Sequence, residues 1–314
     1  MSKDILTFNH PSALQTSTDY ANAATSDNTR KAYQKDIQHY INSGAVLPAT
    51  VDAIMTYLQT YANSLNARTL KRHIVALKHW HTYQGIDDPT VHPLVRKTLS
   101  GIQRIHGKPA EKAKVLTIDQ LQILCDLLTN SSKLSDCRNN ALLQIGFFGA
   151  FRRSELVAIR WEHINHVTEG LTIMIPRSKT DQLGDGQLCA IPYGNDNICP
   201  LRALRLWQVQ SGLTHGPVFR AIEKGGCIKD KALSAASVNE IIKKLAIRAE
   251  FLNPQAYSGH SLRRGFATSA SQKGASMGAI MRQGRWRHEG TVQGYIEEGS
   301  KFNMNAVNTI LGGA

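Results

Sequence analysis

Three segments of this 314-residue chain carry residue types that can act on a phosphate group, namely arginines, a histidine and a late tyrosine. In residues 141–161, an apolar helix is predicted to end near Gly149 and a second helix to begin near Ser154, with Arg152 in the junction. A cation at the start of a helix opposes the helix dipole, so an arginine there is favourable where an anion is bound. Taken alone, the segment is also compatible with an ordinary surface turn.

The other two segments lie toward the C-terminus. His260 and Arg263 are three residues apart, and a helix that begins at Ser261 places both at one edge of its first turn. A histidine beside an arginine can transfer a proton next to a bound phosphate, although a capping histidine and a surface arginine fit the same pattern. Tyr295 follows Trp286 by nine residues. It is either a core aromatic or a nucleophile whose phenolate nearby cations would stabilise.

The order and spacing of these residues resemble the signature of the tyrosine recombinase family, also called the phage integrases. The matching parts are R-x-S-E-L at Arg152–Leu156, H-x-x-R at His260–Arg263, and Tyr295. Where the family usually has Leu-Gly-His before the tyrosine, this chain has Gly284-Arg285-Trp286, and a tryptophan at this place is the Cre-type choice. The likeness covers about residues 26–314.

The resemblance implies a site-specific DNA recombinase that breaks and rejoins strands through a covalent 3′-phosphotyrosine, without metal or ATP. It makes Tyr295 the nucleophile and places Arg152 and Arg263 on the non-bridging phosphate oxygens. It implies that His260 acts as a base or hydrogen-bond donor near the nucleophile. The indole N–H of Trp286 would bind a phosphate oxygen in place of the usual imidazole.

Two further residues receive roles from the same resemblance. Lys179, in a predicted hairpin loop, matches the lysine acid that protonates the leaving 5′-oxygen, although Arg177 lies close to it in sequence. Glu155 matches an acidic residue that orients the site. A glutamate in a first helical turn is also favoured by the helix dipole alone, so a purely local role for Glu155 stays open.

Two other functions remain open at this point. A type IB topoisomerase shares the tyrosine, arginine, lysine and histidine but acts without a partner site. A DNA-binding regulator of the same fold would lack catalysis. A separate N-terminal helical domain and an apolar C-terminal tail favour the recombinase over the topoisomerase, and the complete set of matching residues argues against the regulator.

The composition indicates a polyanionic partner. Lys plus Arg number 37 against 24 Asp plus Glu, a formal charge of +13, which is typical of proteins that bind nucleic acid or an anionic membrane surface. No apolar run is long enough for a transmembrane helix, and no signal peptide is visible. Five cysteines without a CxxC pair favour a reducing cytoplasm. The family resemblance implies a nucleoid-associated protein of bacterial, phage or plasmid origin.

Neither a metal nor another cofactor is expected. The sequence has no cluster of histidine, cysteine and aspartate with metal-ligand spacing, and it has no P-loop segment for ATP. Arginine and lysine can supply the positive charge that a magnesium ion supplies in other enzymes that act on phosphates.

The pattern of predicted helices and strands that must position these residues indicates a mainly α fold in two domains. We expect a mobile tail over residues 1–25, and a helical domain over 26–106 that resembles the family's core-binding (SAM-like) domain. A basic linker over 107–115 and an α+β catalytic domain over 116–314 follow. The helices predicted in the first domain run from Ser26 to about Gly44 and over Val51–Ser64, Ala67–Tyr83 and His92–Ile105.

The second domain is predicted to combine helices with a small antiparallel sheet. Thr117 and Gln120 form a predicted capping box at the start of the first helix. The loop that holds Lys179 is predicted to join two strands, and from Cys199 onward the pattern is helical. The predicted helices and strands before that point are 118–129, 135–149, Leu171–Ile175 and Gln187–Ile191.

Basic side chains gather on the first domain and its linker. A helix over 67–83 would turn Leu70, Ile74 and Leu77 inward and most of its cations outward, toward a DNA groove or backbone. A merely solvated surface is the alternative for one such helix, and charge alone does not separate DNA from RNA. The candidate DNA-binding residues are Arg30, Arg68, Lys71, Arg72, Lys78, Arg104 and Lys108.

An apolar stripe over Phe302–Leu311 predicts a C-terminal helix. Such a helix can dock on its own domain. In Cre-type relatives the last helix is buried in a neighbouring subunit, so the resemblance implies a homotetramer on two DNA sites. Double-stranded DNA with inverted-repeat half-sites, rather than a membrane, is the expected partner.

Overall fold

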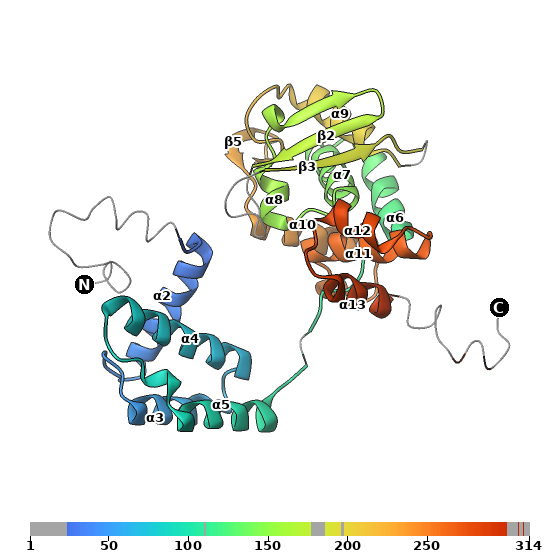
Figure 1. The fold of residues 1–314 in the computed structure, drawn as a ribbon. Helices are drawn as coiled ribbons and strands as arrows, with labels where there is room; N and C mark the ends of the chain where they lie inside the picture. The colour runs from blue at the N-terminus through green and yellow to red at the C-terminus, as the bar shows by residue number, and fades with distance from the viewer. Residues whose placement is uncertain are drawn as a thin grey trace. The chain divides into compact units, whose positions relative to one another are not determined.

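The computed structural model describes residues 24–109, 111–176, 186–195 and 198–299, together with Val307 and Ile310. The chain divides into two compact units, of which the first ends at Glu111 and the second begins at Lys112 (Figure 1). Each unit has its own buried apolar core, so each is described by itself.

The described part of the first unit contains helices and no strand, as the periodicity predicts. The helix α4 presents Leu70, Ile74 and Leu77 to the core, while Gly85 ends it in the left-handed conformation with a φ of +67°. Three of the helices begin at a serine, threonine or asparagine whose side chain accepts a backbone N–H, which explains where they start. The helices are α2 (Asp27–Asn42), α3 (Val51–Tyr61), α4 (Ala67–Gln84), η1 (Pro89–Val91) and α5 (Pro93–His106).

The second unit is mostly helical as well. Its first helix begins at the predicted capping box, where Thr117 and Gln120 exchange hydrogen bonds. Figure 1 shows α11, α12 and α13 side by side at one end of this unit, in orange and red. The helices are α6 (Ile118–Thr129), α7 (Leu134–Phe148), α8 (Arg153–Ala158), η2 (Trp161–His163), α9 (Pro200–Ser211), α10 (Ala235–Arg248), η3 (Pro254–Ala256), α11 (Gly259–Gln272), α12 (Met277–Gly284) and α13 (Glu289–Gly299).

A three-stranded antiparallel sheet accompanies these helices, in the order β1 (Ile164–Val167), β2 (Gly170–Ile175) and β3 (Gln187–Pro192). The register pairs Leu171 with Ile191 and Ile173 with Cys189, all four of them buried. The two predicted strands are therefore confirmed. The sequence did not predict β1, because it has four residues, most of them exposed, and shows no inward–outward alternation.

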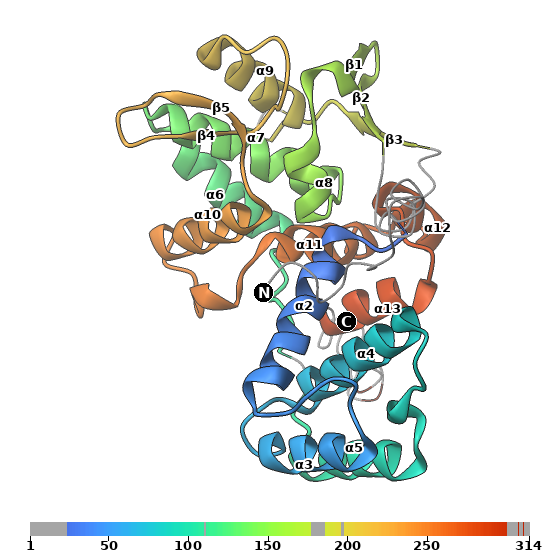
Figure 2. The same ribbon diagram turned by 90° about the vertical axis from the view of Figure 1, so that its left-hand side faces the viewer.

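The expectation of helices alone after Cys199 is wrong. Two strands, β4 (Arg220–Ile222) and β5 (Ile228–Ala232), pair there as a separate antiparallel hairpin, visible beside α7 in Figure 2. These two strands could not be predicted from the sequence, because β4 is only three residues long and the middle of β5 is Lys-Asp-Lys. Such strands carry too little apolar alternation to be distinguished from a loop.

The helix α11, which carries two of the predicted site residues, is held in place by close packing. A Cβ added to Gly265 would lie 1.8 Å from the carbonyl oxygen of Leu116, so only glycine allows the two backbones to approach this closely. A small apolar core that includes Ala267, Ile280 and Val292 then joins α11, α12 and α13. Within the described residues, no helix has both the length and the apolar character needed to cross a bilayer.

Candidate active site

The turn between α7 and α8 forms the floor of the candidate site. Ala150 is fully buried and has a φ of +45°, a conformation that residues other than glycine seldom adopt. Arg152 caps the start of α8 in extended conformation, as the sequence predicted for this junction. The carbonyl groups of Gly149 and Ala150 accept hydrogen bonds from arginines of other segments, which ties the turn to α11 and to the end of α12.

Arg152 and Glu155 form a two-point contact across the first turn of α8. The backbone N–H of Arg152 donates to Glu155 Oε2 at 3.0 Å, and its Nη1 donates to Oε1 at 2.6 Å. Burial alone would raise the pKa of the Glu155 carboxyl. The hydrogen bonds from Arg152 and the charges of Arg285 and Arg152 outweigh burial and hold this pKa below its ordinary value. Glu155 is thus an anion that orients Arg152, in addition to favouring the helix start.

Arg263 lies deep in the site, with 2% of its surface exposed. Its Nη1 donates to the carbonyl of Ala150, and its guanidinium lies 4.1 Å from the ring centre of Trp286. The Nη2 atom is buried and has no hydrogen-bond partner in the part of the chain that the structure describes. Burial, and then the charge of Arg152, lower the pKa of Arg263 to about 9. A bound anion would stabilise the charged guanidinium and so oppose this decrease in pKa.

Tyr295 on α13 meets His260 on the first turn of α11. The Tyr295 hydroxyl and His260 Nε2 are 3.2 Å apart, and the two rings are close to perpendicular. Partial removal of the His260 ring from water lowers its pKa to about 4, together with the charges of Arg264, Arg263, Arg153 and Arg152. The imidazole is therefore neutral at pH 7, and its Nε2 can accept a hydrogen bond from the phenol.

Trp286 packs between these groups. Its ring contacts the guanidinium of Arg263 and lies 6.1 Å from the ring of Tyr295. Gly284 makes this placement possible, because a Cβ there would come within 1.8 Å of the indole ring. The structure thus brings five predicted residues into one cluster with Glu155. They are Arg152, His260, Arg263, Trp286 and Tyr295.

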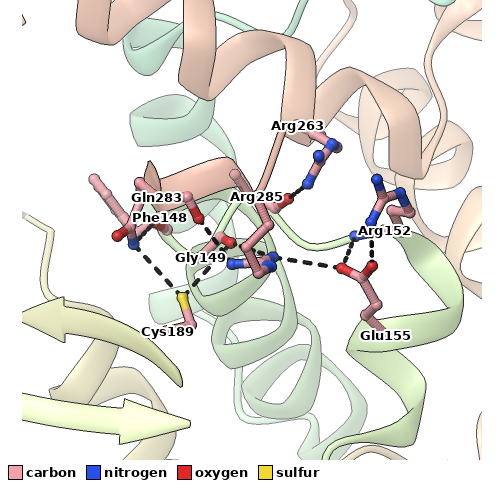
Figure 3. Close-up of polar contacts among 9 residues, drawn as sticks. Phe148, Gly149, Arg152, Glu155, Cys189, Arg263, Gln283 and Arg285 are labelled. Carbon is pink, nitrogen blue, oxygen red and sulfur yellow. Dashed lines mark hydrogen bonds and ion pairs between the residues drawn. The ribbon is translucent and has the colours of Figure 1, made fainter. Parts of the chain in front are cut away.

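Two more arginines belong to the cluster and were not predicted. Arg264 lies 5.3 Å from the ring centre of Tyr295 and pairs with Glu298 at 2.8 Å, and Lys112 binds the same carboxylate at 2.9 Å. Arg285 joins Glu155 to the carbonyl of Gly149, as Figure 3 shows. The only sequence signal for these arginines was their position directly beside a predicted site residue.

One predicted residue is not placed. Lys179 lies outside the described residues, as does the rest of the loop over 177–185, so its role as the acid stays a prediction. Among the described residues, no group of three or more histidine, cysteine, aspartate or glutamate side chains could hold a metal ion.

The candidate DNA-binding residues of the first unit differ in their surroundings. Arg68 and Lys108 both line a cavity of about 280 Å³ at the start of α4. Arg30 is partly buried and pairs with Asp27, whereas Arg72 binds the buried carboxylate of Asp36 with two hydrogen bonds. The remaining candidates are exposed, namely Lys71, Lys78 and Arg104.

A helical unit followed by an α+β unit, with arginine, histidine, tryptophan and tyrosine gathered at one site, defines the class of the tyrosine recombinases. The family model described as "Phage integrase family" matches residues 114–301. The chain is 38% identical over 291 residues to an integrase/recombinase XerD homolog of Selenomonas ruminantium, which covers 90% of this chain and 85% of that protein. The chain belongs to the phage integrase family.

Other comparisons agree with this assignment. Recombinase Cre of Escherichia phage P1 is 28% identical over 265 residues, covering 79% of this chain and 75% of Cre, so Cre is a distant relative. Two solved structures share the fold. XerH bound to a palindromic difH substrate has a TM-score of 0.63 at 17% identity, covering 90% of this chain and 78% of that chain. A lambda integrase dimer bound to a core site has a TM-score of 0.63 at 15% identity, with coverages of 90% and 75%.

Proposed function

We propose that this protein is a site-specific DNA recombinase that breaks and rejoins strands through a covalent phosphotyrosine at Tyr295. The observation that carries the proposal is the 3.2 Å contact between the Tyr295 hydroxyl and a neutral His260, beside an arginine cluster with surplus positive charge. A nucleophile, a proton acceptor and an anion site therefore lie together. Membership of the phage integrase family supports the same function.

In the cleavage step, the Tyr295 oxygen attacks the scissile phosphorus, and its proton passes to His260 Nε2. A tyrosine–phosphorus bond to the 3′-phosphate forms as the bond to the 5′-oxygen breaks. Arg152 and Arg263 bind the non-bridging oxygens, and the Trp286 indole N–H donates to one of them. Lys179 protonates the leaving oxygen. Attack by a 5′-hydroxyl reverses these steps, so the phosphotyrosine keeps the energy of the bond and neither ATP nor a metal is used.

The partner of this reaction is double-stranded DNA with inverted-repeat half-sites. The basic residues of the first unit supply phosphate contacts, and the net charge of +13 favours a polyanion. XerH and lambda integrase, which share the fold, have solved structures in which they are bound to a palindromic difH substrate and to a core site, respectively. We infer that the protein acts on DNA in the bacterial cytoplasm, with the nucleoid, and its relative from Selenomonas ruminantium supports a bacterial setting.

The two alternative functions are less well supported. A regulator without catalysis gives no reason for a tyrosine hydroxyl beside a neutral histidine. A type IB topoisomerase shares the chemistry, but the relatives described above are recombinases.

A nicked suicide substrate tests the cleavage chemistry directly, because the released fragment diffuses away and traps the adduct. The protein should form a covalent adduct, and Tyr295→Phe should form none while DNA affinity stays nearly unchanged, since the attacking oxygen alone is lost. Tyr57→Phe, which alters a buried tyrosine of the first unit, is the control and should keep the adduct. An adduct with Tyr295→Phe would show that another residue is the nucleophile.

The apolar stripe of the C-terminus supports a tetramer in which each subunit contacts the next. Of this stripe the structure describes Val307 and Ile310, which are 50% and 81% exposed. An apolar cavity of about 610 Å³, lined in part by Phe148, Phe266 and Ile280, opens between β3, α11 and α12. The stripe of one copy occupies this cavity of its neighbour, and four copies hold two DNA sites.

Truncation after Gly299 removes this stripe and leaves the described site intact. Half-site affinity should stay within about threefold of the full chain, while cooperative binding and recombination are lost. Ala275→Glu, which charges the cavity rim, should have the same effect, and Val209→Glu on the exposed side of α9 is the matched control. If the truncated protein recombines two sites normally, the stripe is only a cap on its own domain.

A further inference from the structure

We propose that Arg285 is a positioning residue for strand cleavage, which holds the turn before Arg152 in place and offsets the charge of Glu155. This inference rests on the proposed function. The Arg285 side chain is only 5% exposed, so it is not available as a surface contact for DNA. It instead contacts other groups of the second unit.

The guanidinium of Arg285 joins three segments of the second unit (Figure 3). Its Nη2 donates to the carbonyl of Gly149 at 3.0 Å and lies 3.4 Å from Glu155 Oε2. Its Nη1 donates to the carbonyl of Gln283 at 2.8 Å, and the guanidinium lies 4.8 Å from the ring centre of Phe151. A single side chain thus connects the end of α12 to the floor of the site and to α8.

The backbone of Arg285 adopts a conformation that an arginine side chain disfavours. The residue follows α12 with a φ of +56° and a ψ of +44°, the left-handed region that glycine occupies without strain. The contacts of its guanidinium offset the local cost of placing an arginine in this conformation. The next residue is Trp286, so the same turn directs the indole toward Arg263.

The charges of the cluster give Arg285 a second effect. Glu155 pairs with Arg152 at 2.6 Å and with Arg285 at 3.4 Å. A carboxylate bound to Arg152 alone would offset much of the positive charge that Arg152 presents to a phosphate. With Arg285 on its other side, Glu155 orients Arg152 while the cluster keeps its surplus positive charge.

Two neighbouring carbonyl groups of the turn link Arg285 to Arg263. Arg285 holds the carbonyl of Gly149, and Arg263 holds the carbonyl of Ala150. Because these carbonyls belong to consecutive residues, a shift of the turn would displace Arg263 as well as Arg152. Loss of Arg285 should therefore affect both arginines that bind the phosphate in the proposed mechanism.

The test compares Arg285→Gly with Arg285→Lys on the suicide substrate at saturating DNA. Glycine suits the left-handed backbone, so this variant removes the guanidinium without adding strain. Adduct formation should slow by at least about tenfold in Arg285→Gly and recover in part in Arg285→Lys, with half-site affinity unchanged. Arg287→Gly, which removes an exposed arginine from the adjoining loop, is the matched control and should cleave normally.

A double variant separates positioning from general loosening of the fold. If Arg285 acts through Glu155, Arg285→Gly should cost much less in a Glu155→Gln background than in the natural protein. Equal losses in the two backgrounds would overturn the role through Glu155, and normal cleavage by Arg285→Gly would overturn the proposal as a whole. A carbon-13 NMR titration of Glu155 provides a readout that needs no cleavage, and the glycine variant should raise the pKa of this carboxyl. If the natural protein forms no adduct at Tyr295 but the titration shifts, the proposed function fails, whereas the effect of Arg285 on the charge of Glu155 stands.

Discussion

Each unit of this protein contains a buried carboxylate that is linked to a network with arginine, histidine and tyrosine, but the charges of the two networks are balanced differently. In the first unit, Asp36 receives two hydrogen bonds from Arg72, at 2.7 and 2.8 Å, and lies 3.1 Å from His73 Nε2. The Tyr57 hydroxyl lies 2.6 Å from the other nitrogen of His73 and 2.8 Å from His39 Nδ1. Both oxygens of Asp36, both ring nitrogens of His73 and the Tyr57 hydroxyl thus have partners, and burial raises the pKa of Tyr57.

The network of the second unit has more cations than its carboxylate can balance. Arg152, Arg263 and Arg285 surround Glu155, and Arg263 Nη2 has no partner among the described residues. Burial lowers the pKa of His73, but there Asp36 acts in the opposite direction. The charges of four arginines instead lower the pKa of His260 further, in addition to burial. Charge balance therefore separates a network that holds helices together from one that is suited to bind an anion.

The largest expected effect comes from replacing the arginine that binds the carboxylate in each network, Arg152 or Arg72. Arg152→Ala should slow adduct formation by about 10²–10³-fold, because a phosphate oxygen loses its cation in the transition state. Arg72→Ala should leave cleavage by the folded protein largely unchanged. It should instead lower the free energy of unfolding by about 2 kcal/mol, a value reduced because the Arg72 side chain is half exposed.

Suicide-substrate kinetics measure the first effect and urea unfolding measures the second. Both variants are needed, because each serves as the control for the other. A strong loss of cleavage in folded Arg72→Ala would show that the first network takes part in catalysis, and the distinction by charge balance would be wrong.

A pH profile sharpens the comparison at the two histidines. An ordinary histidine has a pKa of about 6.5, whereas that of His260 is about 4, so the neutral acceptor is fully present above about pH 5. Measured at low DNA concentration, where the rate reports the free protein, adduct formation should stay level from pH 8 to pH 5 and fall toward pH 4. A fall centred near pH 6.5 would contradict a neutral His260.

The same profile in His73→Gln should keep its shape, since that histidine lies in the other network. Stability behaves differently. Both histidines have a lowered pKa in the folded state, so the unfolded chain takes up protons first as the pH drops. The free energy of unfolding should therefore decrease as the pH falls below about 6.5, and His73→Gln should reduce that decrease.

The sequence was informative where a role depends on local spacing. Arg152 lies at a helix start and His260 shares one helical turn with Arg263, as the local patterns predicted. That these segments come together with Tyr295 followed from the family resemblance and not from local spacing. Arg285 could not be predicted in this way, because its function depends on a left-handed backbone and on partners about 130 residues away.

The first network shows the same limit. Asp36 and Arg72 are 36 residues apart, on α2 and α4, and nothing in the pattern of either helix pairs them. The helix pattern of α4 correctly predicted its apolar face, yet it treated Arg72 as equivalent to Lys71. Burial of a charge depends on tertiary packing, which periodicity describes only for apolar residues.

The smallest expected effect separates these two neighbours on α4. Lys71 is exposed, whereas the Arg72 guanidinium is already bound to Asp36. Loss of one phosphate contact should lower the slope of log affinity against log salt by about 0.9, so Lys71→Ala should show about this change. Arg72→Ala should change the slope less, because Asp36 already offsets the charge that is removed. Salt titrations of half-site binding measure both slopes, and an equal change in the two variants would show that Arg72 leaves Asp36 to bind DNA.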